Sequence, residues 1–132
     1  MKNCLPLVTL AALALGLAST ASAAVETYAI DPVHSSVAFS IRHFVSKVPG
    51  SFTKFAGTIT VDRANLANSS VDATIEVGSV STASEARDKH LKTPDFFDAE
   101  KFATITFKSK AWKATGESTF DVTGDLTIHG VT

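Results

Sequence analysis

Apolar and polar residues alternate with a period of two in several separate stretches of the chain. In residues 36–44, for example, Val37, Phe39 and Ile41 alternate with polar residues. Such alternation places every second side chain on the same face of a β-strand, with the apolar face buried and the polar face in water. The same pattern occurs in residues 25–30, 52–61, 71–77, 102–112 and 120–128. We therefore predict an all-β, antiparallel fold of about six strands.

The segments between these stretches have the composition of turns and loops. Residues 48–50 and 114–117 are turn-like, and residues 62–70 form a loop rich in Asn and Ser. Residues 120–128 are expected to form one last strand, or two strands with a kink near Gly124. Residues 82–85 (Thr-Ala-Ser-Glu) fit a capping box, which predicts one short helix that ends before Pro94.

The predicted helix is highly charged and leads into two adjacent phenylalanines, Phe96 and Phe97. A polar helix followed by an aromatic pair is unusual between β-like segments. A helix laid across one opening of a β-barrel would keep its charges in water, while the phenylalanines would close the apolar interior. We therefore expect one short helix near a barrel opening and an interior suited to an apolar ligand.

The N-terminus has the pattern of a secretory signal peptide. Lys2 precedes an apolar run over residues 5–17, and residues 21–23 have the small-residue pattern that signal peptidase recognises. The apolar run is shorter than the roughly 20 residues that span a membrane. We predict a cleaved signal peptide at residues 1–23 and one exported domain at residues 24–132, without stable membrane insertion.

The charge and cysteine content of the chain narrow its possible partners and its sources of stability. The chain has 12 basic and 13 acidic residues, so loss of Lys2 with the signal leaves 11 basic residues and a formal net charge of −2. This charge provides no basic field to concentrate nucleic acid or anionic lipid headgroups, and we exclude nucleic acid as a partner. Cys4 is the only cysteine. The exported domain therefore has no internal disulfide and depends on its packed core.

The end of the sequence, residues 126–132, has the pattern of a strand that no turn or polar tail follows. A closed barrel that holds a small ligand needs about eight strands. About six strands would leave two unpaired edges, which natural proteins avoid. We therefore expect an incomplete barrel in a chain that lacks its C-terminal portion, and free edges that allow a homodimer.

Several sequence blocks, taken in order, resemble one known family. The blocks are residues 28–35, 39–43, 50–52, 55–57, 95–98, 105–109 and 124–132, together with Arg87-Asp88-Lys89-His90-Leu91. The chain resembles the YceI-like family of bacterial exported proteins, which have a lipocalin-like barrel and bind polyisoprenoid lipids. Family members normally continue past the last block with strands that close the barrel. The resemblance implies a C-terminally truncated YceI-like β-barrel domain at residues 24–132.

The resemblance further implies an exported lipid-binding protein, which sequesters or carries an isoprenoid of the polyprenyl phosphate or isoprenoid quinone type in the periplasm. No cofactor is expected besides the bound isoprenoid lipid. Burying a chain contributes about 0.8 kcal/mol per CH₂, so a few isoprene units suffice without strong polar contacts. Two alternatives stay open. One is binding of another amphiphile, such as a fatty acid or fatty amide. The other is a non-catalytic interaction protein with a filled barrel.

The residues expected to line the cavity are apolar side chains of the inward strand faces, the helix and the phenylalanine pair, plus one histidine. They are Phe39, Ile41, His43, Ile59, Ile75, Leu91, Phe96, Phe97, Ile105, Phe107 and Phe120. Each apolar residue among them could instead be ordinary core. His43 ends a strand face and could hydrogen-bond a ligand headgroup near a barrel end, although a histidine satisfied by backbone or by Asp is the commoner case.

The helix carries three cations that could grip a phosphate, Arg87, Lys89 and Lys92. Acidic residues are interleaved with them, which favours a solvated helix face with pairs at i and i+3 or i+4.

Metal-binding and catalytic patterns are weak. His34, His43, His90 and His129 are scattered, whereas metal ligands usually occur at short spacings. The chain has no Gly-x-Ser-x-Gly motif, no His-Glu-x-x-His motif and no phosphate-binding glycine loop. We therefore predict no metal site and no enzymatic activity.

Overall fold

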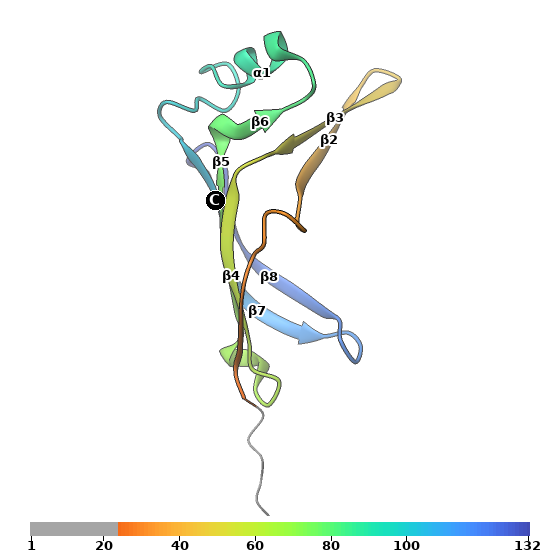
Figure 1. The fold of residues 1–132 in the computed structure, drawn as a ribbon, viewed down its shortest axis with the longest axis vertical. Coiled ribbons are helices and arrows are strands. Elements are labelled where there is room, and N and C mark those ends of the chain that lie inside the picture. The colour runs from red at the N-terminus through yellow and green to blue at the C-terminus, as the bar shows by residue number, and fades with distance from the viewer. Residues whose placement is uncertain (1–23) are drawn as a thin grey trace, which may run out of the picture.

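The computed structural model describes residues 24–132, so the predicted signal peptide at residues 1–23 lies outside the described residues. The described residues form eight β-strands, one α-helix and two short 3-10 helices (Figure 1). The strands are β1 (Glu26–Ala29), β2 (Val37–His43), β3 (Ser46–Phe52), β4 (Phe55–Val61), β5 (Ser70–Glu76), β6 (Val80–Ser81), β7 (Thr104–Ala114) and β8 (Phe120–Thr127). The helices are α1 (Glu85–Leu91), η1 (Leu66–Asn68) and η2 (Val77–Ser79).

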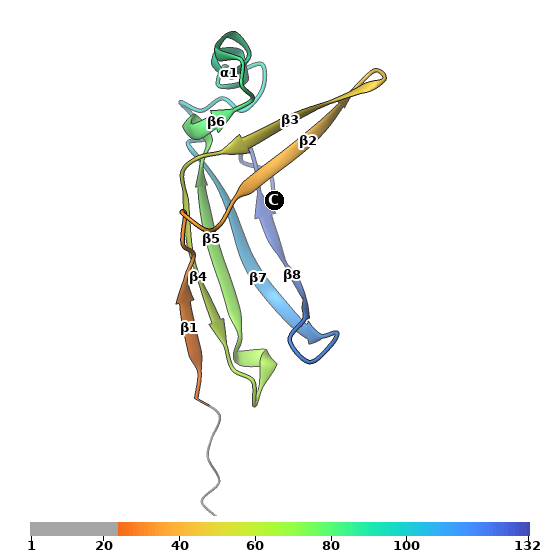
Figure 2. The same ribbon diagram turned by 45° about the vertical axis from the view of Figure 1, so that its right-hand side comes forward.

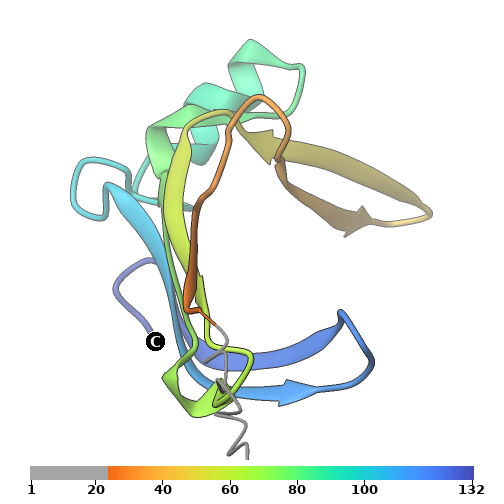
Figure 3. The ribbon, with the colours of Figure 1, turned by 60° about the horizontal axis from the view of Figure 1, so that its bottom comes forward.

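The strands form two sheets in which every paired strand is antiparallel. One sheet has the order β1-β4-β5-β7-β8, and the other has the order β2-β3-β6. Figure 3 shows the two sheets as an open trough, with the β2–β3 hairpin on one side of the opening and the β7–β8 hairpin on the other. Helix α1 lies at one end of this trough (Figures 1 and 2). The predicted all-β antiparallel class with one helix is confirmed, and within residues 24–132 the barrel is incomplete, as expected.

The register of the larger sheet explains the period-two pattern of the sequence. Ile59 pairs with Val71, Ile75 with Ile105, and Phe107 with Leu126. Paired residues point to the same side of a sheet, so these apolar side chains share one face. The opposite face carries polar side chains, among them Thr58, Thr60, Asp72, Thr74, Thr106 and Lys108. The apolar face is the one that carries Ile105, a core residue.

The hydrophobic core lies where the two sheets meet beside α1. Its buried members are Phe52, Val77, Val80 and Ile105, which come from β3, η2, β6 and β7. Each contributes on the order of 1.5–3 kcal/mol by its removal from water. Partly buried residues pack around them, namely Val37, Phe39, Ile75, Leu91, Phe97 and Ala99.

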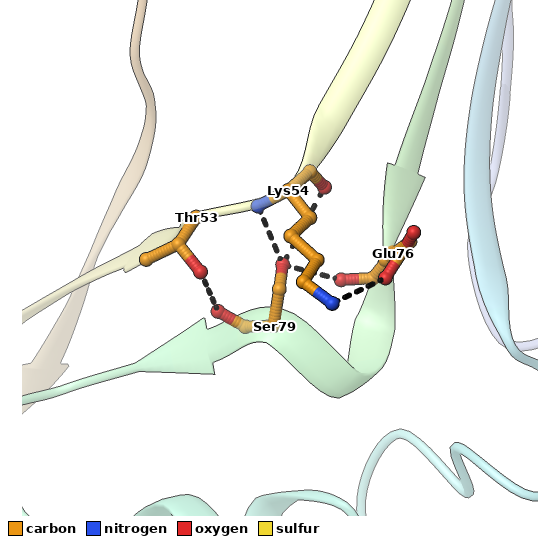
Figure 4. A network of polar contacts seen from close by, with 4 residues as sticks. All are labelled: Thr53, Lys54, Glu76 and Ser79. Atoms are coloured by element: carbon orange, nitrogen blue, oxygen red, sulfur yellow. Dashed lines mark hydrogen bonds and ion pairs between the residues drawn. The ribbon is translucent and has the colours of Figure 1, made fainter. Parts of the chain in front are cut away.

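Two corners join the sheets, one from β3 to β4 at Thr53 and Lys54, the other from β5 to β6 through η2. Ser79 links these corners (Figure 4). Its Oγ accepts from the Lys54 backbone N–H at 3.0 Å and donates to the Glu76 carbonyl at 2.7 Å. Its carbonyl accepts from the Thr53 hydroxyl at 3.3 Å. The Lys54 ammonium lies 3.6 Å from the Glu76 carboxylate. The polar contacts therefore hold the corners together.

The turn predicted at residues 48–50 is wrong, because these residues lie within β3. The hairpin turns instead at Phe44 and Val45, with His43 paired to Ser46. Proline lacks a backbone N–H, but β6 pairs only with Ser51 and Phe52 of β3. Pro49 therefore meets no ladder partner on that side. Gly50 is required for another reason, since a Cβ there would run into the ring of Phe39.

Helix α1 is confirmed, but the predicted capping box is wrong. The residue that caps the helix N-terminus is Ser84, which makes no side-chain cap hydrogen bond. Thr82 instead donates from its backbone N–H and its hydroxyl to Asp88 Oδ1, at 2.8 and 2.6 Å. The Asp88 side chain in the first helical turn thus accepts two hydrogen bonds from Thr82, the residue that follows strand β6.

Of the two alternatives for residues 120–128, the single strand is confirmed, and the irregularity lies on the neighbouring strand. Strand β8 is continuous, while β7 has a β-bulge between Ser109 and Ala111, opposite Gly124. A Cβ on Gly124 would meet the Lys108 carbonyl oxygen and would lie 2.8 Å from the Ser109 Cα. The glycine therefore lets the bulged backbone of β7 approach β8 closely.

We expect Gly124→Ala to lower the free energy of unfolding by about 1–3 kcal/mol, because the added methyl group meets backbone that is fixed by the sheet. Chemical denaturation measures this change. Gly78→Ala is the matched control, since a Cβ at Gly78 has no neighbour within 4 Å. Equal denaturation midpoints for the two variants would contradict the close approach at Gly124.

Candidate functional site

An apolar cavity of the described residues, here called the main cavity, has a volume of about 560 Å³. It lies between the two sheets at the end that carries α1. Its lining comes from β2, β3, α1, the segment after α1, β7 and the end of the chain: Phe39, Ile41, Phe52, Leu91, Phe96, Phe97, Ile105, Ile128 and His129. His129 is the only polar residue among these nine. The main cavity can therefore bury apolar groups but offers them few hydrogen bonds.

A second pocket, here called the side pocket, adjoins the main cavity and has a volume of about 320 Å³. The two share Phe39, Ile41, Leu91 and Phe96 as a common wall. The remaining lining residues of the side pocket are His43, Val48, Thr82, Arg87 and His90, but the surface that they present to the space is almost entirely apolar. Together the two spaces form an apolar interior, with polar side chains around its side-pocket end.

The segment after α1 folds back beneath the helix and so places the phenylalanine pair. The backbone N–H of Phe97 donates to the Leu91 carbonyl at 3.0 Å, and that of Ala99 donates to the Lys92 carbonyl at 2.9 Å. Phe97 then packs edge-on against Phe52, with ring centroids 5.8 Å apart. Phe52 in turn lies 5.5 Å from the ring of Phe39. Three rings from separate elements thus form one side of the main cavity.

Phe96 is half exposed and separates the main cavity from the side pocket. The His90 ring meets the Phe96 ring edge-on, with centroids 4.9 Å apart. His129 Nδ1 donates to the Phe96 backbone carbonyl at 2.7 Å. His90 is itself held by Asp95, whose carboxylate lies 3.0 Å from Nε2. Phe96 is therefore fixed from both sides by histidines that also line the two spaces.

Arg87 is held against the side pocket by Thr82. Its Nε donates to Thr82 Oγ1 at 2.7 Å, and its Nη2 donates to the Thr82 carbonyl at 2.8 Å. Because Thr82 is buried and is bonded to Asp88, the guanidinium group has a fixed direction. Arg87 is exposed, and within residues 24–132 the structure gives its Nη1 no hydrogen bond, so this nitrogen can still donate beside the side pocket.

The other two cations of the helix lie elsewhere. Lys89 pairs with Glu85 at 2.9 Å, one helical turn away. Lys89 and Lys92 line a different surface pocket, together with Lys54 and Asp88. The expectation of a solvated, paired helix face therefore holds for Lys89, whereas Arg87 is exposed but is held by Thr82 and not by an acidic residue of the helix.

Most of the sequence-predicted cavity residues lie around the two spaces. Six of them line the main cavity: Phe39, Ile41, Leu91, Phe96, Phe97 and Ile105. His43 lines the side pocket. Four line neither space, namely Ile59, Ile75, Phe107 and Phe120. Ile75 packs on the core, a Cβ at Gly124 would meet the Phe107 ring, and the Phe120 ring lies 5.5 Å from that of Trp112.

Sequence reasoning missed several lining residues. Phe52, Ile128 and His129 line the main cavity, and Val48, Thr82, Arg87 and His90 line the side pocket. Phe52 begins one of the alternating stretches, so its apolar face was visible in the sequence. Val48 was hidden by the erroneous turn at residues 48–50.

The remaining histidine, His34, is exposed and lies 2.6 Å from the Asp31 carboxylate. This hydrogen bond, together with one from the Val33 backbone N–H, holds the pKa of Asp31 below its usual range. Among residues 24–132 no three His, Cys, Asp or Glu side chains are grouped so that they would hold a metal ion. In that same part of the chain, no helix has the length and apolar character needed to cross a membrane.

Comparisons with known proteins agree with the fold. A family model described as the YceI-like domain matches residues 28–132. A UPF0312 protein of Ectopseudomonas mendocina is 44% identical over 127 residues, which cover 93% of this chain and 66% of the relative. The chain thus spans slightly less than two thirds of the length of this curated relative.

Solved structures lead to the same family. BcnA of Burkholderia cenocepacia superposes with a TM-score of 0.70 at 32% identity, covering 76% of this chain and 64% of BcnA. The YceI protein of Campylobacter jejuni superposes with a TM-score of 0.60 at 38% identity, covering 79% of this chain and 61% of that protein.

We expect Ile41→Asp to weaken binding of an uncharged apolar dye, N-phenyl-1-naphthylamine, by about tenfold or more. Ile41 lines both spaces, and a carboxylate there would remove apolar contact and place a charge against the dye. Its side chain is 59% exposed, so the fold should persist. Fluorescence titration measures the affinity. Val33→Asp is the control, because Val33 is 82% exposed and lines neither space. Equal affinities for both variants would contradict dye binding in the interior.

Proposed function

The chain belongs to the YceI-like domain family, and on this basis we propose that it is a non-catalytic protein that binds an amphiphilic lipid in its apolar interior. The ligand is an isoprenoid of the polyprenyl phosphate or isoprenoid quinone type, which the protein sequesters or carries. It does so in the periplasm, after removal of residues 1–23.

The observation that carries this proposal is the lining of the main cavity. Its volume of about 560 Å³ lies within the range of small-molecule sites, roughly 300–1,000 Å³. Eight of its nine lining residues are apolar. An apolar ligand gains affinity for such a wall by burial alone, at about 0.8 kcal/mol for each CH₂ that is taken from water. A space of this size supports ligand binding over the alternative of a barrel filled by its own side chains.

The polar side chains around the side pocket support an orientation for the ligand. The tail occupies the main cavity, and the headgroup lies in the side pocket beside Arg87, His43 and His90. A phosphate or carboxylate there accepts charge-assisted hydrogen bonds from the guanidinium group that Thr82 holds in place. A fatty acid or fatty amide would fit the same arrangement and remains the second candidate ligand.

Native mass spectrometry of the protein from its own exported fraction tests the proposal. We expect one added mass that releases a polyprenyl or isoprenoid quinone compound on denaturation, and an N-terminus at Ala24. Release of a fatty acid or fatty amide would instead identify the second candidate as the ligand. A protein that is recovered bare, and that takes up none of these lipids on titration, would overturn lipid binding.

We expect Arg87→Gln to weaken binding of geranylgeranyl phosphate by about tenfold, the effect of one charge-assisted hydrogen bond. Binding of uncharged geranylgeraniol should change little, because its tail contacts are kept. Calorimetric titration of both lipids measures the difference.

Two further variants separate a headgroup contact from a structural role of Arg87. Lys89→Gln, on the same helix but outside the side pocket, should leave both affinities unchanged. Arg87→Lys should recover part of the phosphate affinity, since it keeps the charge. Equal losses for the phosphate and the alcohol in Arg87→Gln would contradict the orientation.

A further inference from the structure

The two most exposed large apolar side chains of the described residues lie side by side, at the tip of the β2–β3 hairpin. Phe44 is 87% exposed and Val45 is fully exposed. Figures 1 and 2 show this hairpin projecting from the rest of the molecule. The tip of the hairpin is therefore an apolar point held away from the body of the protein.

Packing within residues 24–132 gives no reason for an aromatic residue at this tip. Phe44 has a φ of +52°, a backbone conformation that Gly or Asn adopts more readily in a two-residue hairpin turn. Its ring contacts the adjacent His43 ring, with centroids 4.7 Å apart, and takes no part in the core cluster. An aromatic residue at this position thus costs backbone stability, and little of its side chain is buried in return.

The hairpin behind the tip is basic. Its strands carry Arg42, His43 and Lys47 and no acidic residue, although the whole chain has a formal net charge of −1. Arg42 and Lys47 are paired directly across the hairpin, an arrangement in which like charges repel. Within residues 24–132 neither of them has an ion-pair partner. Two unneutralised cations therefore stand next to the apolar tip.

We propose that this tip, made of Phe44 and Val45 with Arg42 and Lys47 behind them, docks transiently on the surface of an anionic phospholipid bilayer. Apolar side chains enter the boundary between headgroups and acyl chains, while cations stay at the level of the phosphates. The tip offers one group of each kind, with the cations one register pair behind the His43–Ser46 pair that flanks the turn. Two apolar residues give reversible contact, which agrees with the absence of stable membrane insertion expected from the sequence.

The same hairpin also forms part of the proposed lipid site. Ile41, His43 and Val48 line the side pocket, a few residues behind the tip. Docking would therefore bring the polar end of the interior towards the bilayer from which a lipid is taken or to which it is returned. This link to lipid exchange depends on the proposed function, whereas docking itself depends only on the hairpin.

Sedimentation with vesicles tests the docking. We expect the protein to bind vesicles of phosphatidylethanolamine and phosphatidylglycerol more tightly than vesicles of phosphatidylcholine, with a loss of binding at high salt. The double variant Phe44→Gly with Val45→Asn should bind about tenfold more weakly or worse. Glycine suits the positive φ, and Gly-Asn is a favourable hairpin turn, so the variant should keep its fold.

Further variants make the result specific. Arg42→Gln with Lys47→Gln should abolish the preference for anionic vesicles, and Val33→Asn, at an exposed apolar site elsewhere, should change nothing. Wild-type protein that binds neither kind of vesicle, or a tip variant that binds as well as wild type, would overturn the proposal. If wild type binds no vesicles but crosslinks to a protein partner that the tip variant does not, the tip belongs to a protein interface instead.

The same proteins, titrated with geranylgeraniol in solution, separate this inference from the proposed function. If the tip variant binds the lipid normally but not the vesicles, both proposals stand. If wild type binds vesicles through the tip but takes up no lipid, docking stands and the lipid-binding proposal falls.

Discussion

The structure depends on the place where its two sheets join. Strands β3 and β4 turn one corner and β5 and β6 turn the other, and the chain packs the two corners against each other. Phe52, Val77 and Val80 are buried on the inner side, while the hydrogen bonds of Ser79 hold the outer side. Without this junction the sheets would have no fixed angle, and neither the main cavity nor the position of α1 above it would be defined.

The sequence predicted the strands because half-buried sheets impose a period of two, and this period survives in residues 36–44 and 71–77. It also predicted which face of each strand is apolar. It did not predict where along the trough the sheets converge, since alternation assigns a face and says nothing of position along the axis. Ile59 and Phe107 therefore have the expected face but lie outside the cavity, whereas Phe52 and Ile128 line it. Strand β3 was not predicted, because Pro49 and Gly50 are typical of a turn. The strand tolerates proline because β6 pairs only with its last two residues.

The interior combines two environments that the helix segment separates. On one side the rings of Phe39, Phe52 and Phe97 form a continuous apolar wall. On the other side Arg87 is directed by hydrogen bonds to Thr82, while Lys89 on the same helix is paired and points elsewhere. Both cations of this seven-residue helix are exposed, but one is held beside the side pocket and the other lines a different surface pocket. Residue type alone does not distinguish these cations, because the difference arises from the bonds made by the strand before the helix.

The strand order has a kinetic consequence. The β2–β3 and β7–β8 hairpins and the β4–β5 pair join strands that follow one another in the sequence, whereas β1–β4, β3–β6 and β5–β7 join strands separated by at least one intervening strand. Contacts between distant residues carry the larger loop-closure entropy, so they are the slow steps of folding. The hairpins therefore form early, and the pairing of β3 with β6 and of β5 with β7 comes late. Because that pairing creates the junction, the main cavity is the last part of the structure to form.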